Sequence, residues 1–203
     1  MSLIKTRILQ SQFELIRDRI GAILADEFSY QAVTFNDSDL SGLKVWISRS
    51  VPFDKTNPPA VNVNFVHGDY YSEDVSTNTN IYKFSIDCHA AAKTQANGKD
   101  GDELGMYRVQ KLMGIACRIL NNTQYRTLGW AAPSVQTRWI ESMDVADPAR
   151  NDADSMMFGR IIFSVRINED IQLLTAKNIQ GYDTKAQLDL TNEGYMYKVN
   201  AYA

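Results

Sequence analysis

The chain has 203 residues, of which 44% are hydrophobic and 22% charged, values typical of a globular protein that buries its own core. It carries 21 Lys and Arg against 24 Asp and Glu, and this net charge of −3 argues against a dedicated nucleic-acid binder with a basic surface. Its two cysteines, Cys88 and Cys117, exclude a disulfide-rich scaffold and a zinc site of four thiolates.

The N-terminal segment predicts an amphipathic helix. It does not have the form of a signal peptide, and no run in the chain approaches the roughly 18 apolar residues that span a bilayer. Apolar residues from Ile4 to Leu24 recur at steps of three and four, which places them on one side of a helix. We expect a helix over Lys5–Leu24. We also expect a soluble, intracellular protein that has no membrane partner.

Residues 30–60 are predicted to be mostly extended or irregular. Leu43–Ile47 has the aromatic and β-branched composition of a strand. Pro52, Pro58 and Pro59 then interrupt regular structure.

Two half-buried antiparallel strands follow. Apolar residues alternate with polar ones over Val61–Phe65 and again over Tyr82–Cys88, the period of a strand with one buried face. The segment between them, His67–Asn80, is predicted to be a long loop. Because long loops on rigid strands often carry contacts to partners, four of its residues are candidates for a protein interface. These are Tyr70, Tyr71, Glu73 and Asp74.

A second helix and two further strands complete the predicted core. The helix begins near Asp100 or Asp102, either of which can cap it, buries an apolar stripe from Leu104 to Leu120 and ends at Asn121-Asn122. Val135–Glu141 and Met157–Ile167 are predicted strands. The segment between them, Ser142–Ser155, is acidic and is predicted to be a loop.

This order of elements predicts an α+β fold, an antiparallel sheet with two principal helices packed on one face. We assign residues 1–168 to this core and residues 169–203 to a C-terminal extension. Gln187–Leu190 and Tyr195–Val199 can pair as a hairpin, which is either lent to a neighbouring subunit or an edge hairpin of its own subunit. Its apolar and aromatic residues are interface candidates: Leu188, Leu190, Tyr195 and Tyr197.

The sequence predicts no catalytic, cofactor-binding or metal site. The four residues that could act as soft metal ligands are not spaced as a metal motif: His67, Cys88, His89 and Cys117. Cys88 and His89 are adjacent, so on a strand they point to opposite faces, and Cys88 is predicted to lie in the core. Neither a P-loop nor a G-x-S-x-G motif occurs. We therefore do not expect an enzyme.

The order of elements resembles that of the tail terminator proteins of tailed bacteriophages. The resemblance covers about residues 3–168 and rests on element order and local style, since the family has no invariant motif. The segments that carry it are the opening helix Lys5–Leu24, the strand entry Pro58-Pro59-Ala60-Val61-Asn62-Val63, the helix start Asp102-Glu103-Leu104, and the helix end Arg118-Ile119-Leu120-Asn121-Asn122 followed by Tyr125-Arg126-Thr127-Leu128-Gly129.

The resemblance implies a structural virion protein, found in the tail or neck and assembled in the host cytoplasm. Such proteins form a ring, usually of six copies, that caps the tail tube, ends tail polymerisation and joins the tail to a neck or head-completion protein. DNA passes through the lumen without specific binding, and the acidic segments at Glu73-Asp74 and Asp144–Asp154 either line it or are plain solvated loops. The extension, through Gln187–Val199, would dock tail sheath or a neck protein.

Two alternatives stand beside this interpretation. One is another neck or tail-completion protein with the same fold. The other is a cytoplasmic enzyme or ligand-binding domain whose site the sequence does not reveal. Assembly into rings would favour a structural tail or neck protein. A monomer that binds a small ligand would favour the enzyme or ligand-binding domain.

Overall fold

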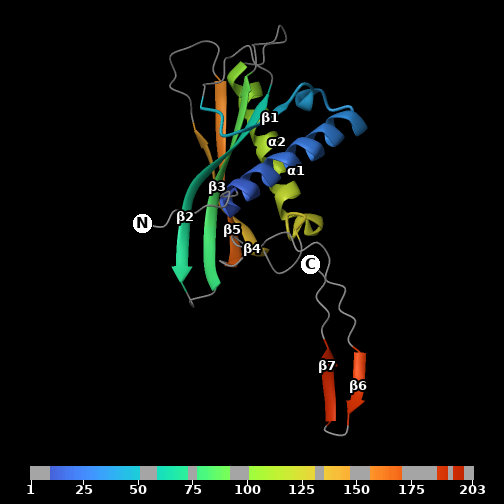
Figure 1. Ribbon diagram of the computed structural model, residues 1–203. Helices are drawn as coiled ribbons and strands as arrows, with labels where there is room; N and C mark the ends of the chain where they lie inside the picture. Colours follow the sequence, from blue (N-terminus) through green and yellow to red (C-terminus); the bar gives the residue numbers. More distant parts are fainter. Residues whose placement is uncertain are drawn as a thin grey trace. The chain divides into compact units, whose positions relative to one another are not determined.

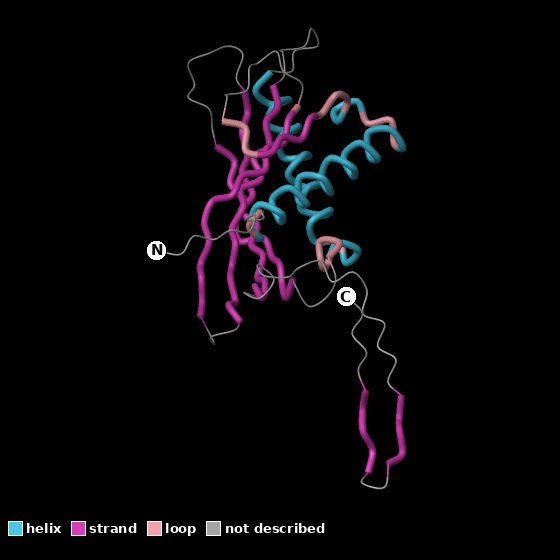
Figure 2. The backbone as a smooth tube through the Cα atoms, in the orientation of Figure 1, coloured by secondary structure: helices cyan, strands magenta, loops and turns pink. Residues whose placement is uncertain are grey.

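The computed structural model describes residues 10–50, 59–72, 77–91, 101–130, 135–146, 156–170, 187–191 and 194–198. The chain divides into two compact units, Met1–Ile171 and Gln172–Ala203. In the first unit a five-stranded sheet is covered on one face by two long helices (Figures 1 and 2), which confirms the predicted α+β class. Its elements are α1 (Gln12–Thr34), η1 (Ser38–Leu40), β1 (Lys44–Ile47), β2 (Ala60–Ser72), β3 (Thr77–Ala91), α2 (Gly101–Asn121), η2 (Thr123–Tyr125), β4 (Val135–Ala146) and β5 (Met156–Asp170).

The sheet is mixed, so the prediction of a purely antiparallel sheet was wrong for one strand. Its order is β1-β2-β3-β5-β4, and the pairs β2·β3, β3·β5 and β5·β4 are antiparallel. β1 instead pairs parallel to β2, with Lys44 opposite Ala60 and Ile47 opposite Val63. Because the two strands run in the same direction, the end of β1 and the start of β2 lie at opposite ends of their ladder.

α1 lies later in the chain than the sequence predicted. Its N-terminus is fixed at Ser11, whose backbone N–H and hydroxyl both donate to the Glu14 carboxylate, at 2.9 and 2.8 Å. The hydrogen bond from the Ser11 backbone is also the main cause that lowers the pKa of Glu14. The helix runs on to Thr34 because Phe28 and Ala32 continue the four-residue spacing from Leu24, and Phe28 is buried. The first residues of the predicted helix, 5–9, lie outside the described part of the chain.

β2 and β3 form one long hairpin in place of the predicted loop. A bulge between Phe65 and His67 shifts the register, after which pairing continues to Ser72 opposite Asn78. The bulge changes the phase of the alternation, so the strand pattern is hidden in the sequence from Val66 onward. Tyr70 and Tyr71 therefore lie on a strand, and Glu73 and Asp74 lie outside the described residues.

The core lies between the helices and one face of the sheet. Val61, Phe84 and Phe163 are buried on neighbouring strands, and Ile20 and Leu112 are buried on α1 and α2. The predicted positions of Asn62, Asn64 and the polar residues of β3 on the opposite face are confirmed by the register. α2 ends at Asn121, as predicted, while Asp100 and the side chain of Asp102 lie outside the description.

α2 approaches the sheet closely at one glycine of β5. A Cβ atom at Gly159 would collide with the Met113 sulfur and would come within 2.8 Å of Val109 Cγ1, both on α2. Gly159 lies opposite Cys88, which is fully buried as predicted. Because Gly159 has no side chain, α2 can pack closely against β3 and β5 at this point.

Both C-terminal strands of the sheet are longer than predicted. β4 continues past Glu141 to Ala146, and Asp144 pairs with Arg160 in the ladder, so the prediction of a loop from Ser142 was wrong for the first part of that segment. β4 has register shifts between Val135 and Thr137 and between Ile140 and Ser142, and the second of these lies where the predicted strand ended. The acidic residues after Ala146 lie outside the described residues.

The second unit contains a two-stranded antiparallel ladder of β6 (Gln187–Thr191) and β7 (Gly194–Lys198). Leu188 lies opposite Tyr197 and Leu190 opposite Tyr195. This is the hairpin that the alternation predicted.

Candidate interaction surfaces

The residues predicted from sequence as an interface fall into two groups. Tyr70 and Tyr71 are both exposed near the end of β2. Tyr70 lies on the helix side, with its ring 5.8 Å from that of Tyr82, and Tyr71, the next residue along the strand, lies on the other side. The two tyrosines therefore do not form one patch.

The second group is on the hairpin of residues 187–198. Directly opposed residues and residues two apart share a face of a ladder, so the register places Leu188, Leu190, Tyr195 and Tyr197 at positions of one face. These four belong to the unit of residues 172–203, whereas Tyr70 and Tyr71 belong to the unit of residues 1–171. Glu73 and Asp74 lie outside the described residues.

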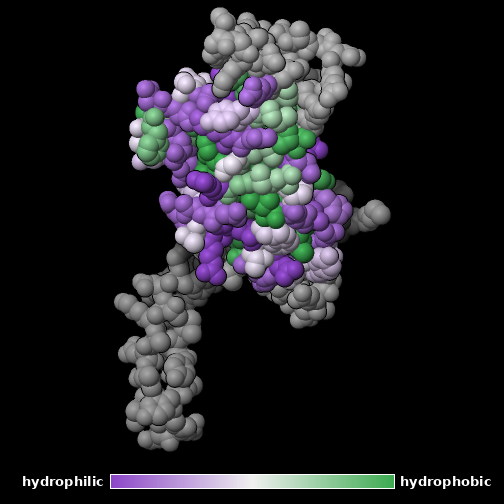
Figure 3. Space-filling model, turned by 180° about the vertical axis from the view of Figure 1, so that it is seen from behind, coloured by the Kyte–Doolittle hydropathy of each residue, from purple (hydrophilic) through white to green (hydrophobic). Residues whose placement is uncertain are grey.

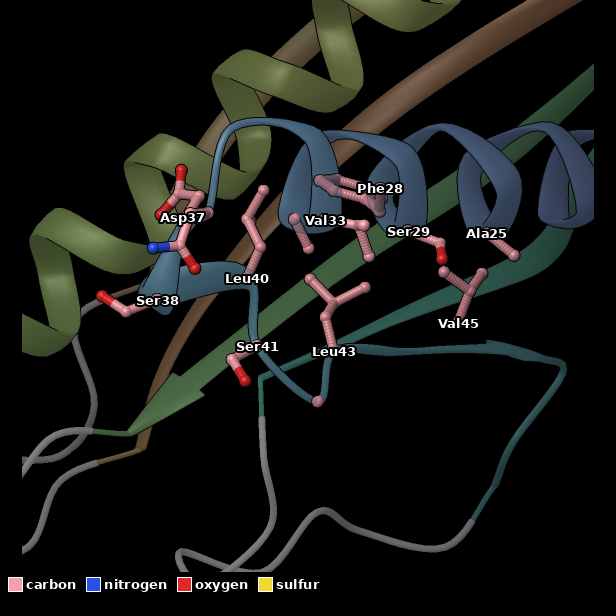
Figure 4. A pocket seen from close by; sticks show the side chains of 13 residues that line it. Ala25, Phe28, Ser29, Val33, Asp37, Ser38, Leu40, Ser41, Leu43 and Val45 are labelled. Atoms are coloured by element: carbon pink, nitrogen blue, oxygen red, sulfur yellow. The ribbon is translucent and has the colours of Figure 1, made fainter.

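A groove that the sequence did not reveal lies at the β1 edge of the sheet. It has a volume of about 690 Å³ and is walled by the C-terminal half of α1, by η1 and by β1. Figure 4 shows Val45 pointing toward Ala25 and Ser29, and Leu43 pointing toward Val33. Val33, which lines the groove, and Phe35, two residues further along the chain, are 80% and 66% exposed. Apolar side chains of this size in contact with water beside an open groove are typical of a docking surface.

One wall of this groove is tied to α2 by ion pairs. Lys111 Nζ lies 2.8 Å from Asp37 Oδ1 and 2.9 Å from Asp39 Oδ2, and Arg108 Nε lies 3.2 Å from Asp39 Oδ1. The hydrogen bond from Lys111 is the main cause that lowers the pKa of Asp39. The turn after α1 is therefore held in place, and the groove is preformed.

A second apolar surface lies at the opposite edge of the sheet, on β4. Met143 and Val145 are 48% and 39% exposed. Met143 Sδ lies 3.3 Å from Cys117 Sγ on α2, and Val145 pairs with Gly159, which contacts α2, so both side chains lie on the helix side. Seen from behind, the described surface carries apolar residues between hydrophilic ones (Figure 3).

The face of the sheet away from the helices carries a polar network that is internally satisfied. Arg160 donates two hydrogen bonds to Asp87, and Asn64 Nδ2 donates to Asp87 Oδ2 at 3.2 Å. Asn62 joins the network through Asn64 and through the backbone of Arg49, from which it accepts and to which it donates at 3.0 Å. Because its groups bond one another, this network stabilises the sheet and leaves few free donors for a ligand.

The residues considered for soft metal ligation are dispersed. Cys88 is buried, and burial raises the pKa of its thiol. His89 packs against the Phe158 ring on the other face, as the strand alternation predicted, and burial lowers its pKa. His67 pairs with Asp69 at 2.9 Å. Within the described residues no group of three or more His, Cys, Asp or Glu could hold a metal ion.

Comparison with protein-family models and with curated proteins finds no match for this chain. Neither of the two long helices, in the part of the chain that the structure describes, has the length and apolar character needed to cross a membrane.

Proposed function

We propose that this protein is a structural subunit that assembles into a ring, of the kind that caps the tail tube of a tailed bacteriophage, ends tail polymerisation and joins the tail to a neck or head-completion protein. The observation that carries the proposal is that two different apolar surfaces lie at the two opposite edges of one sheet. The groove beside Val33 and Phe35 borders β1, and Met143 and Val145 lie on β4.

Two unlike surfaces on opposite sides of a subunit favour head-to-tail contacts. Such contacts close into a ring when the rotation between subunits permits, whereas a single self-complementary patch gives a dimer. The resemblance to tail terminators in the order of helices and strands supplies the kind of ring. The α+β class of the described part of residues 1–171 is the fold class that this resemblance implies, and it supports the proposal.

The hairpin of β6 and β7 is assigned a separate role in this proposal. It belongs to the second compact unit, and its register places two leucines and two tyrosines at positions of one face. A strand pair of this kind suits docking of tail sheath or of a neck protein by strand addition. Deleting residues 172–203 is then expected to leave ring formation intact and to abolish that docking.

The test is the assembly state of the purified full-length chain, measured by native mass spectrometry and by negative-stain electron microscopy. Rings, of six copies or a similar closed number, are the expected result, either alone or after addition of tail tubes from the same phage. A chain that stays monomeric at high concentration with tubes present would contradict the proposal. It would favour a ligand-binding domain instead, with the groove at β1 as its site.

A further inference from the structure

We propose that successive copies of this chain associate by sheet continuation: β1 of one copy pairs antiparallel with Ser142–Ala146 of β4 in the next. The inference rests on the proposed function, because it names the contact that would build the ring. It commits the groove at β1 to one occupant, which is the helix-facing side of β4 from a second copy.

The strand directions at the two edges fit this pairing. β1 runs parallel to β2, and three antiparallel pairs then separate β2 from β4. β1 and β4 therefore run in opposite directions within one subunit. When a second copy is added in the same orientation, its β1 lies antiparallel to the β4 that it meets, and the helices of both copies lie on the same side of the continued sheet.

Both edges offer backbone groups for such a ladder. Lys44 N–H donates to the Pro59 carbonyl at 3.1 Å and Ser48 N–H to the Val63 carbonyl at 2.9 Å, both toward β2. In a parallel ladder alternate residues bond the same neighbour, so the backbone groups of Val45 and Ile47 point to the outer edge. On β4 the register is regular from Ser142 to Ala146, a stretch long enough to pair with all four residues of β1.

The apolar side chains of the two edges fall on the same side. Val45 packs against the core, and a Cβ at Gly21 of α1 would come within 2.9 Å of Ile47, so both lie under the helix layer. Met143 and Val145 also face the helix layer. An alignment with Val45 opposite Val145 puts Ile47 opposite Met143. Met143 and Val145 of the second copy then extend the lining of the groove, part of which is formed by Val45.

Charge at the two edges is complementary in the same alignment. β1 has the exposed Lys44 at its start and Arg49, stacked 4.5 Å from the Trp46 ring, beyond its end. The facing stretch of β4 has the exposed Asp144, and Glu141, which pairs with Lys83 of its own subunit at 3.1 Å. Trp46 comes opposite Asp144. Arg49 and Glu141 lie beyond the same end of the paired stretch, because the backbone leaves the extended conformation at Ser48 (φ 51°) and β4 has a bulge before Ser142. Cations on one edge and anions on the other favour unlike edges over like ones.

The test is a disulfide between copies. Trp46 directs its N–H toward β2, so Trp46 and Asp144 of the next copy would be a non-hydrogen-bonded pair, with Cα atoms about 4.5 Å apart. That separation lies within the range of roughly 4.4–6.8 Å that a disulfide bridges. Both residues are exposed, so replacing them leaves the core intact. The background is Cys117→Ser, which removes the half-buried thiol, while Cys88 is buried.

Mixing Trp46→Cys chains with Asp144→Cys chains under mild oxidation is expected to give a covalent dimer. A chain that carries both substitutions is expected to give a series of covalent oligomers. Two controls are expected to stay uncross-linked: Asp144→Cys chains alone, and Trp46→Cys chains mixed with Arg118→Cys chains, since Arg118 is exposed on α2. The pair Val45→Cys and Val145→Cys repeats the measurement on the other face if the first pair fails to fold.

The outcomes separate this inference from the proposed function. Rings without cross-linking by either pair would overturn the edge pairing and leave the ring function standing. Cross-linking in open filaments that never bind tube ends would support the pairing and contradict the terminator function. A monomer that neither cross-links nor binds tubes would overturn both.

Discussion

The guanidinium of Arg160 holds the carboxylate of Asp87 through two hydrogen bonds, 2.7 Å from Nε and 3.0 Å from Nη2, on the face of the sheet away from the helices. Asp87 is buried, whereas Arg160 is partly exposed. The hydrogen bond to Asp87 raises the pKa of Arg160. The pair joins the two central strands β3 and β5 and anchors the polar network that includes Asn64.

Replacing Arg160 with Met is expected to lower the free energy of unfolding by about 2–3 kcal/mol, because the buried Asp87 carboxylate loses its charged partner. The double variant Arg160→Met, Asp87→Asn is expected to recover part of this loss, since it leaves no unpaired charge. Urea unfolding of the two single variants, the double variant and the parent measures the coupling. Single variants that each lie within about 0.5 kcal/mol of the parent would show that the pair is no more than a surface contact.

The close approach of α2 to β5 gives a second prediction. Gly159→Ala is expected to destabilise the fold by about 1–3 kcal/mol, because the added methyl group overlaps Met113 and Val109 and pushes the helix off the sheet. Gly114→Ala is the matched control. Nothing lies within 4 Å of a Cβ at that position, and Gly114 is in the interior of α2, so alanine there is expected to stabilise by about 0.5–1 kcal/mol. Thermal unfolding distinguishes the two signs.

The ion pairs that hold η1 to α2 predict a pH dependence. The hydrogen bond from Lys111 lowers the pKa of Asp39 below its usual value of 3.8. The ionised carboxylate therefore stabilises the fold above that pH, and the contribution is lost as the pH falls through the lower value in the folded state. Asp39→Asn is expected to cost about 1 kcal/mol at pH 7.

Urea unfolding of the parent and of Asp39→Asn at pH 7 and at pH 2–3 measures this contribution. The difference between the two proteins is expected to shrink toward the acid end, as the Asp39 carboxylate of the parent becomes protonated. A difference that is the same at both pH values would mean that Asp39 acts through its shape and not through its charge.

The sequence predicted those parts of the fold in which one residue pattern persists. The alternation of Val61–Phe65, Tyr82–Cys88 and Met157–Ile167 marked three strands and their buried faces correctly. The hairpin beyond Phe65 was missed because a bulge reverses the alternation, and a bulge has no sequence signature of its own here. The end of α1 was missed although Phe28 and Ala32 carried the helical spacing.

The groove and the edge strands could not be predicted from the sequence for a different reason. β1 is four residues long, and the direction in which it pairs with β2 is not encoded by any local residue pattern. That Met143 and Val145 lie at an edge depends on the insertion of β5 between β3 and β4. Strand order is a property of the whole sheet, so the exposed apolar residues of both edges became visible only in the assembled fold.

The β4 edge supplies the last prediction, on self-association. Val145→Lys is expected to weaken assembly at least about tenfold, because it places a charged side chain in the apolar contact with Val45 and Ile47 of the next copy. Val145 is already 39% exposed, so the free energy of unfolding is expected to change by less than about 0.5 kcal/mol. Tyr107→Lys is the control, since Tyr107 is exposed on α2 and belongs to neither of the two edge strands that form the proposed contact.

Sedimentation velocity over a concentration series measures the association constants of the parent and of both variants. The parent and Tyr107→Lys are expected to have the same association constant, whereas Val145→Lys is expected to sediment as smaller species at each concentration. Equal weakening by both lysines would mean that added positive charge acts on assembly without regard to position. Unchanged assembly of Val145→Lys would place the contact between copies away from β4, since a lysine buried among apolar side chains without a partner could not be accommodated there.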